Sequence, residues 1–258
     1  MAKFKFKKKY GQNFLQDTHT IEKIVDSINP TTDDLIIEIG PGAGAITKSL
    51  KKFNAKIIAF EIDDETKKYL LPLEDEKTKI IYADFLYSDI AKILKNYENC
   101  RIFFIGNLPY YITTPIIEHI IDSGISHESL TVMVQREVAD RFLAKPGHKE
   151  YGYMTVLLNF NYDISKVIDV DRKKFYPVPN VDSTVLKLTS KKKIDGDYEK
   201  LKKLLKDSFQ FKRKTLKNNL NNYDTAKIEK ILNEDGYSLS NRAEEIPLDV
   251  YIKIWKNI

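Results

Sequence analysis

Short apolar runs alternate with helical patterns along the first half of the chain, and this alternation restricts the possible folds. The run at 35–39 is rich in β-branched residues and stops at Gly40, as a buried strand does, whereas residues 20–28 repeat isoleucine and valine at helical spacing. Strands that alternate with helices favour a parallel sheet with crossover helices. We therefore predict an α/β fold, with strands at 35–39, 56–61, 79–82, 101–105 and 130–134 and helices at 20–28, 46–53, 64–71, 115–121 and 137–143.

The pattern changes toward the carboxyl end of the chain. Residues 155–162 and 181–188 resemble further strands, the second of them paired antiparallel at an edge of the sheet. Residues 190–197 form a charged linker, and only helical periodicity remains after it. We therefore predict a large domain at 1–189 and a small C-terminal all-α domain at 190–258.

Positive charge is concentrated in two segments. The formal net charge is +5, yet residues 187–217 hold twelve Lys or Arg against four Asp or Glu, and the first nine residues hold five Lys and no acid. Such a concentration suits a polyanionic partner such as RNA, although a solvated lysine-rich surface would give the same count. We expect the 187–217 segment to contact nucleic acid.

The cysteine and histidine content excludes several classes of site. Cys100 is the only cysteine, so the chain forms no intramolecular disulfide and no cysteine-based metal site, which fits a reducing compartment. The four histidines lack ligand-like spacing, so we expect no metal site. The N-terminus does not read as a signal peptide, and no apolar run approaches the roughly 20 residues of a membrane span. We predict a cytoplasmic protein with no membrane partner.

A glycine-rich segment follows the first predicted strand and opens a helix. It reads EIGPGAGAIT over residues 38–47, with Gly40, Gly42 and Gly44 in the loop. Glycine lets the backbone approach a ligand closely. Gly40, Gly42 and Ala45 also satisfy the dinucleotide-binding fingerprint. The loop therefore predicts a nucleotide-like cofactor, leaves nicotinamide and S-adenosylmethionine both open, and also allows a purely structural turn.

Acidic residues stand at the ends of the next two predicted strands. Glu61 closes the second strand, where a carboxylate accepts hydrogen bonds from both ribose hydroxyls of either cofactor, although a solvated charge would look the same. Asp84 lies just past the third strand, where it would take an adenine amine while Phe85 covers the ring; a turn residue is the alternative. Because ligands bind at the carboxyl edge of an open α/β sheet, we predict Glu61 and Asp84 as cofactor contacts.

The segment Gly106-Asn107-Leu108-Pro109-Tyr110 follows the fourth strand and lies at the same edge of the sheet. It resembles the Asn/Asp-Pro-Pro/x-Tyr motif of amine-directed DNA and RNA methyltransferases, and its form is typical of the rRNA adenine dimethyltransferases. An adenine amine is a poor nucleophile because its lone pair is delocalised into the ring. We expect the Asn107 amide oxygen and the Leu108 carbonyl to accept its two N–H groups. Pro109 helps to aim that carbonyl, and Tyr110 stacks on the extruded base.

Three further segments extend the resemblance. Phe175 opens a Phe-x-Pro-x-Pro-x-Val-Asp-Ser stretch that resembles the second base-stacking element of the family, although composition alone would place this ring in the core. Gln12, Asn13 and Leu15 belong to a YGQNFL motif similar to the one that lies over the bound cofactor. Residues 209–220 resemble the C-terminal helical element of the small-subunit enzymes.

Over residues 9–220 the chain thus resembles the KsgA-type small-subunit rRNA adenine-N6,N6-dimethyltransferases. The resemblance implies a Rossmann-like, S-adenosylmethionine-dependent methyltransferase sheet in which Asn107 also contacts the cofactor. It implies transfer of methyl groups to the N6 amines of two adjacent adenosines near the 3′ end of 16S rRNA. The implied partner is 16S rRNA within an immature small ribosomal subunit, the implied role is in subunit biogenesis, and the implied state is a monomer.

Three other functions compete with this prediction. A large-subunit (23S) rRNA adenine methyltransferase of the macrolide-resistance type shares the fold, the cofactor and a similar motif, but the 209–220 element favours the small-subunit branch. A nicotinamide-dependent dehydrogenase is allowed by the glycine loop but leaves residues 107–110 and the basic segment unexplained. A non-catalytic RNA-binding factor is disfavoured by an intact Asn107 and Tyr110.

Overall fold

The computed structural model describes residues 13–97 and 99–258. They form two compact units. The first runs to Ala139 and includes Ser165–Ser190, and the second holds Asp140–Ile164 and Lys191–Ile258. The second unit thus includes residues 140–164, which the predicted limits 1–189 and 190–258 assign to the large domain. Those limits stay a prediction.

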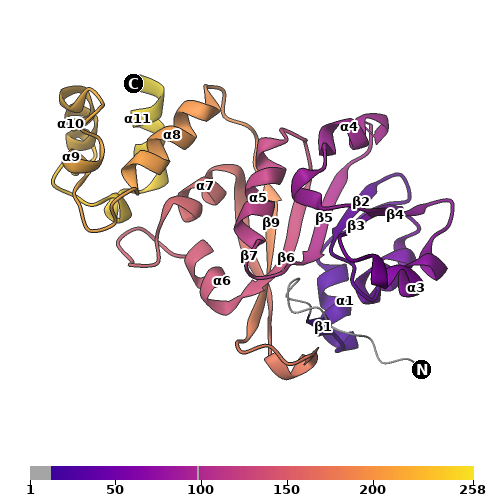
Figure 1. The fold of residues 1–258 in the computed structure, drawn as a ribbon. Coiled ribbons are helices and arrows are strands. Elements are labelled where there is room, and N and C mark those ends of the chain that lie inside the picture. The colour runs from indigo at the N-terminus through magenta and orange to yellow at the C-terminus, as the bar shows by residue number, and fades with distance from the viewer. Residues whose placement is uncertain (1–12, 98) are drawn as a thin grey trace. The chain divides into compact units, whose positions relative to one another are not determined.

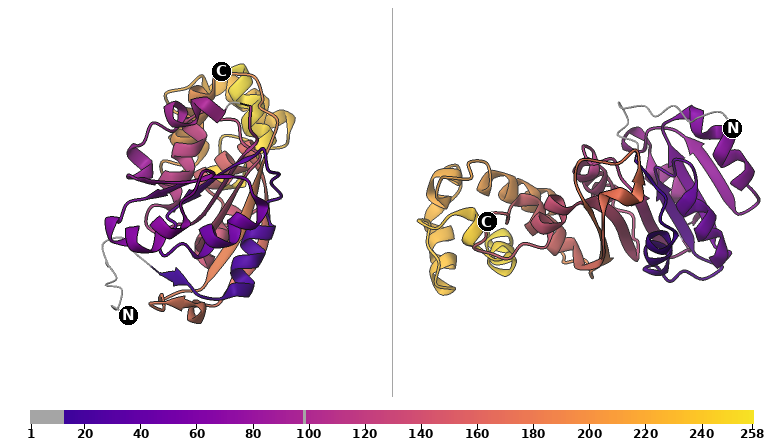
Figure 2. Two further views of the ribbon diagram at one scale, coloured as in Figure 1. Left: turned by 90° about the vertical axis from the view of Figure 1, so that its right-hand side faces the viewer. Right: turned by 90° about the horizontal axis from the view of Figure 1, so that it is seen from below.

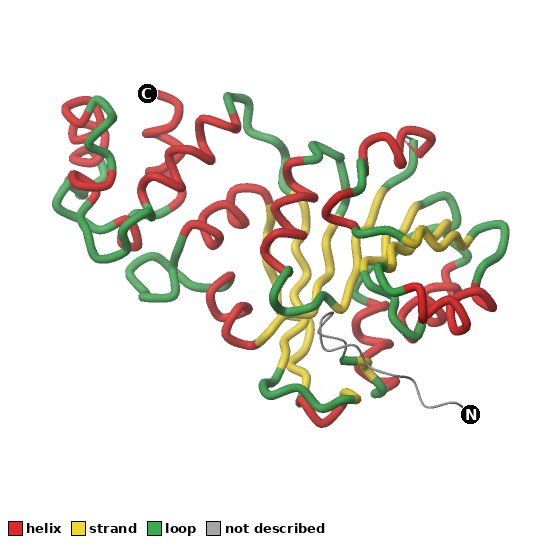
Figure 3. The backbone as a smooth tube through the Cα atoms, in the orientation of Figure 1, coloured by secondary structure: helices red, strands yellow, loops and turns green. Residues whose placement is uncertain are grey.

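A seven-stranded sheet forms the centre of the first unit, in the order β4-β3-β2-β5-β6-β9-β7 (Figures 1 and 3). The neighbours from β4 to β6 pair in parallel, and β9 runs antiparallel to β6. The predicted α/β fold is confirmed, since the five strands expected early in the chain lie within two residues of observed ones. The strands are β2 (Leu35–Ile39), β3 (Lys56–Glu61), β4 (Thr78–Tyr82), β5 (Ile102–Asn107), β6 (Ser129–Gln135), β7 (Tyr162–Val170) and β9 (Ser183–Ser190).

Helices cover both faces of this sheet (Figure 2). On one face α1 (Thr18–Asp26) contacts α2 (Ala45–Leu50), and Ile24 shares a core with Ile36 and Phe103 of the strands. Side chains alternate along a strand, so Phe104 faces the other side, where α5 (Thr113–Asp122) packs. The remaining helices of this unit are α3 (Lys67–Leu70), α4 (Ile90–Leu94) and the first residues of α6 (Arg136–Phe142).

A short two-stranded sheet lies beside the main one. It pairs β1 (Phe14–Leu15) antiparallel with β8 (Phe175–Tyr176), so that Leu15 stands opposite Phe175. The ammonium of Lys174 donates to the Asp17 carboxylate at 2.8 Å, and this pair holds the pKa of Asp17 at about 2. The first described residues are thereby tied to a segment far along the chain.

The second unit is helical. Trp255 donates its indole N–H to the Asp197 carbonyl at 2.7 Å and packs edge-on against Phe160 with ring centres 5.6 Å apart. Gly196 has φ 151° and passes so close to this indole that an added Cβ would lie 2.3 Å from it, so only glycine fits. The helices are α7 (Tyr153–Asn161), α8 (Tyr198–Ser208), α9 (Leu216–Asn219), α10 (Thr225–Glu234) and α11 (Leu248–Asn257).

One predicted strand is wrong. Residues 155–162 were expected to be extended, but they lie almost entirely in the helix α7, which begins after Gly152. Six of its nine residues are buried, on all of its sides, so the sequence carries no helical stripe of polar residues to distinguish it from a strand. The strand β7 that follows was not predicted, because its exposed edge mixes charged and apolar residues.

Candidate active site

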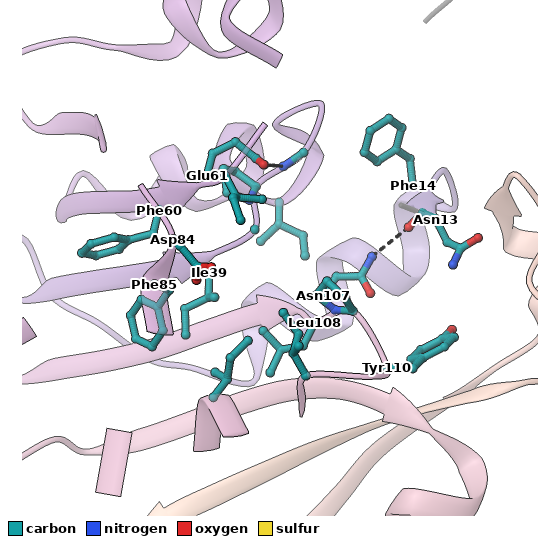
Figure 4. A pocket seen from close by; sticks show the side chains of 18 of the residues that line it. Asn13, Phe14, Ile39, Phe60, Glu61, Asp84, Phe85, Asn107, Leu108 and Tyr110 are labelled. Atoms are coloured by element: carbon teal, nitrogen blue, oxygen red, sulfur yellow. Dashed lines mark hydrogen bonds between the residues drawn. The ribbon is translucent and has the colours of Figure 1, made fainter. Parts of the chain in front are cut away.

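A cavity of about 460 Å³ opens at the carboxyl ends of the central parallel strands (Figure 4). Its wall includes most of the residues predicted as site residues, namely Asn13, Leu15, Gly40, Gly42, Glu61, Asp84, Asn107, Leu108, Pro109 and Tyr110. Gly44 and Phe175 are not in this wall, and Gln12, with the rest of the basic N-terminus, lies outside the described residues. Asn13 and Leu15 thus line the cavity, and their role as cofactor contacts stays a prediction.

The glycine loop forms one end of the cavity. Gly42 has φ 57°, and an added Cβ would lie 2.6 Å from the Phe14 ring, so the close approach of β1 to this loop requires glycine. Gly44 has φ 79° and precedes α2, but its Cα faces Leu73 and Leu70. Gly42 thus shapes the cavity, whereas Gly44 allows the turn behind it to pack.

Glu61 is the last residue of β3 and is only 4% exposed. Its carboxylate accepts the Gly42 N–H at 2.9 Å and the Asp63 N–H at 2.8 Å, which fixes the glycine loop to the strand end. Burial raises the pKa of Glu61 despite these donors. A carboxylate oxygen accepts more than one hydrogen bond, so this group can still receive a ligand hydroxyl.

A second buried carboxyl, on Glu38, lies behind Glu61. Its side chain is 1% exposed, and burial raises its pKa to about 7, with the nearby Glu61 charge adding to the shift. Sequence reasoning included Glu38 in the glycine segment without giving it a role. The signal that was available is its charge inside an otherwise apolar strand.

Asp84 caps the short turn that follows β4. Its carboxylate accepts the Leu86 N–H at 3.0 Å, and the side chain lies at the cavity edge. Phe85 is buried and packs edge-on against Phe60 at 5.2 Å between ring centres. Phe85 thus forms the floor beside Asp84, and Figure 4 shows the two rings together below Glu61.

Asn107 ends β5 and faces the first described residues. Its side-chain N–H donates to the Asn13 carbonyl at 3.1 Å, and because the amide is planar its oxygen points away from Asn13 (Figure 4). The carbonyl of Leu108 precedes Pro109, which holds Leu108 in an extended conformation. Two acceptors therefore lie in adjacent residues of one wall.

Tyr110 completes this wall. Its hydroxyl lies 2.7 Å from the Ser183 Oγ, and burial raises the pKa of the phenol. Tyr111 is next to it and is 62% exposed, and Tyr87 is 89% exposed on the wall of the same cavity. Tyr111 and Tyr87 were not predicted, because exposure leaves no local sequence pattern. Ser183 ends the predicted 175–183 stretch but was given no role of its own.

Phe175 lies in the core of the structure. It is 2% exposed, belongs to the same apolar cluster as Leu15 and Val185, and pairs with Leu15 in the small sheet. The core location that composition favours is therefore the observed one. The base-stacking role of Phe175 stays a prediction, and it requires the ring to become exposed.

The basic segment contributes exposed cations to the second unit. Its exposed members around α8 and α9 include Lys206, Lys212, Arg213, Lys214 and Lys217. Phe211 stands among them and is 55% exposed.

Within residues 13–97 and 99–258 no helix is long and apolar enough to cross a membrane. The same residues contain no His, Cys, Asp and Glu group suited to a metal ion.

Comparison with known proteins identifies relatives of the chain. Residues 3–258 match the profile of the family described as ribosomal RNA adenine dimethylase. "Ribosomal RNA small subunit methyltransferase A" of Aster yellows witches'-broom phytoplasma (strain AYWB) is 41% identical over 254 residues, which cover 96% of this chain and 94% of that protein.

Two crystal structures share the fold. A dimethyladenosine transferase from Plasmodium falciparum aligns with a TM-score of 0.77 and 24% identity over 93% of this chain and 95% of that one. The 23S rRNA methyltransferase ErmE aligns with a TM-score of 0.70 and 23% identity over 95% of this chain and 99% of that one.

Proposed function

Because the chain belongs to the ribosomal RNA adenine dimethylase family, we propose that it methylates two adjacent adenosines near the 3′ end of 16S rRNA. The product is N6,N6-dimethyladenosine, and the methyl donor is S-adenosylmethionine. The full-length similarity to a small-subunit methyltransferase supports the choice of RNA. The observation that carries the proposal is the cavity in which Glu61 and Asp84 at one end meet Asn107, Leu108 and Tyr110 at the other.

The cavity fits S-adenosylmethionine in size and charge. Its volume of about 460 Å³ lies in the usual range for small-molecule sites. The cofactor carries a sulfonium and an ammonium, and the carboxylates Glu61 and Asp84 in the wall favour a cation. When bound, the cofactor supplies an electrophilic methyl group.

The residues that would hold the cofactor lie at or just after the carboxyl ends of the strands. We assign the ribose hydroxyls to Glu61 and the adenine amine to Asp84. The backbone of Gly40 and Gly42 would approach the cofactor closely, while Gly44 supports the loop. Asn13 and Leu15, with Gln12 before them and Asn107 opposite, would cover it.

The target base is recognised at the other end of the cavity. The Asn107 amide oxygen and the Leu108 carbonyl accept the two N–H groups of the adenine amine, which favours a pyramidal nitrogen with its lone pair free to attack. Pro109 aims the Leu108 carbonyl, and Tyr110 stacks on the extruded ring. No strong base is required, because the amine proton becomes acidic once the methyl has been transferred; positioning supplies most of the rate.

We place Phe175 on the opposite face of the base. Its burial between β1 and the core means that binding of the base has to uncover this ring. The exposed cations of the 187–217 segment would hold the flanking RNA through its phosphates, which raises affinity without reading sequence. The enzyme acts as a monomer in the cytoplasm on 16S rRNA within an immature small subunit, and contributes to its biogenesis.

The competing 23S activity shares the fold, so structure alone does not decide between the two RNAs. The decisive experiment offers purified protein four substrates with a labelled methyl donor: free 16S rRNA, free 23S rRNA, and mature and immature small subunits from cells that lack the modification. We expect label on two adjacent adenines of the immature subunit. Label on 23S rRNA alone would replace this proposal with the large-subunit alternative.

A further inference from the structure

The hydroxyl of Tyr110 is held by a residue outside its own segment. It lies 2.7 Å from the Ser183 Oγ, although the two residues are 73 positions apart in the sequence. Ser183 opens β9 and is completely buried. Because burial raises the pKa of Tyr110, the phenol is protonated at neutral pH, and the contact is a neutral hydrogen bond that orients the ring.

Ser183 is itself fixed by the residues around it. It pairs with Gln135 at the end of β6. The preceding Asp182 accepts the Arg136 N–H on its carbonyl and the Arg172 N–H on its carboxylate, both at 3.0 Å, and the Arg136 guanidinium lies 3.4 Å from that carboxylate. The hydroxyl that meets Tyr110 is therefore mounted on a braced strand end rather than on a loop.

Stacking alone does not need this hydrogen bond. Any phenyl ring offers a π face to a base, so the hydroxyl of Tyr110 adds nothing to the stacking surface itself. A tyrosine side chain turns about two bonds, and its hydroxyl lies on the axis of the second, so a contact at the tip restricts the first bond and fixes where the ring lies. In a reaction that depends on positioning, a small displacement of the acceptor base lowers the rate.

We propose that Ser183 is a positioning residue for methyl transfer, which fixes the position of the Tyr110 ring and thereby that of the target adenine. This inference rests on the proposed adenine methyltransferase function. Ser183 touches neither the base nor the cofactor in this assignment. Its effect should therefore appear in the rate of transfer rather than in the binding of either substrate.

A double-mutant cycle tests the proposal. Ser183→Ala removes one partner, Tyr110→Phe removes the other while keeping the ring, and the double variant removes both. Each single variant should lower kcat about five- to tenfold, the amount that a neutral hydrogen bond of ordinary strength is worth. The double variant should lose no more than either single one, with KM for rRNA and the affinity for S-adenosylmethionine unchanged.

Ser129→Ala is the matched control. Ser129 also opens a strand, β6, and is buried, but its hydroxyl has no hydrogen-bond partner within the described part of the chain. It should leave kcat unchanged. A 2-aminopurine at the target position gives a second readout, since stacking quenches its fluorescence and Ser183→Ala should brighten the bound RNA.

Several results would overturn the proposal. Losses that multiply in the double variant would mean that the two hydroxyls act independently, and full kcat in Tyr110→Phe would mean that the tether is dispensable. The measurement on Tyr110→Phe tests the proposal even if Ser183→Ala fails to fold. Failure of the proposed function gives a different result from failure of this inference. In that case the protein without substitutions would transfer no methyl group to adenine in any rRNA.

Discussion

The two ends of the cavity are built differently. The cofactor end, defined as Gly42, Glu61 and Asp84, already has its carboxylates bonded to backbone N–H groups. The base end, defined as Asn107, Leu108 and Tyr110, is proposed to hold the adenine against Phe175, a ring that is 2% exposed and pairs with Leu15 of β1. The carboxylates of the cofactor end are therefore already placed, whereas the proposed stacking at the base end requires Phe175 to become exposed when RNA binds.

Removal of Glu61 should disrupt the cofactor end alone. Glu61→Ala deletes the carboxylate that joins Gly42 to the strand end, and we expect the affinity for S-adenosylmethionine to fall by about 2–5 kcal/mol. Calorimetry measures this loss, with the exposed Glu76→Ala as a control of equal charge change. Unchanged cofactor affinity in Glu61→Ala would show that this end is assigned wrongly.

Asn107 tests the base end. Asn107→Ala should lower methyl transfer by a factor of about a hundred or more, as loss of an oxyanion-hole group does, while thermal stability is kept and cofactor affinity falls less than in Glu61→Ala. Asn107→Asp is the informative partner, because it retains an acceptor oxygen, replaces the amide that donates to Asn13 with a second oxygen and adds a negative charge. Single-turnover rates should rank the asparagine and aspartate forms above alanine. Substantial activity in the alanine variant would contradict the role.

The buried Glu38 makes the stability of the folded chain depend on pH. Its pKa of about 7 lies above the ordinary 4.5, so between these values the folded chain binds more protons than the unfolded one. Stability should fall as the pH rises through this window and level off above it, by at most roughly 3 kcal/mol. Asp17 and Asp75, with pKa values of about 2, lose their contributions only at lower pH.

Glu38→Gln should remove this dependence, because a glutamine does not titrate. Urea unfolding on both sides of the window measures the difference between the two proteins. The variant should gain stability relative to the parent as the pH rises. Parallel pH profiles for the parent and Glu38→Gln would show that this carboxyl is ionised throughout.

A substitution at Phe175 separates its role in the core from its proposed role in stacking on the target base. Phe175→Leu keeps the apolar volume, so it should cost less than about 1.5 kcal/mol of stability. If the ring also stacks on the target base, methyl transfer should fall by about tenfold, within the 1–3 kcal/mol range of base stacking. Melting curves and kcat, measured on the same preparation, separate the two roles. Unchanged kcat would leave Phe175 as a core residue only.

Local patterns in the sequence predicted the strand ends and much less of what connects them. Apolar runs that stop at Gly40 or Glu61 mark the carboxyl edge of a parallel sheet, and the cavity lies there. The helix α7 was predicted as a strand at 155–162, because its burial on all sides removes the periodicity that distinguishes a helix from a strand. The Tyr110 contact with Ser183 depends on strand pairing across the sheet, which no local pattern encodes.

The affinity of the protein for RNA should depend on the basic 187–217 segment and not on either end of the cavity. The 187–217 segment carries +8 by its twelve cations and four acids, and Arg213 and Lys214 are exposed within it. Each phosphate contact contributes about 0.9 to the slope of log affinity against log salt on duplex nucleic acid and about 0.7 on single strands. Reversal of Arg213 and Lys214 to Glu should therefore weaken rRNA binding and flatten that slope by about one to two, with cofactor affinity unchanged.

Reversal of Lys227 and Lys230, exposed cations of α10 outside the segment, makes the same charge change and should alter the slope less. An equal effect of the two reversals would mean that net charge, and not this segment, holds the RNA.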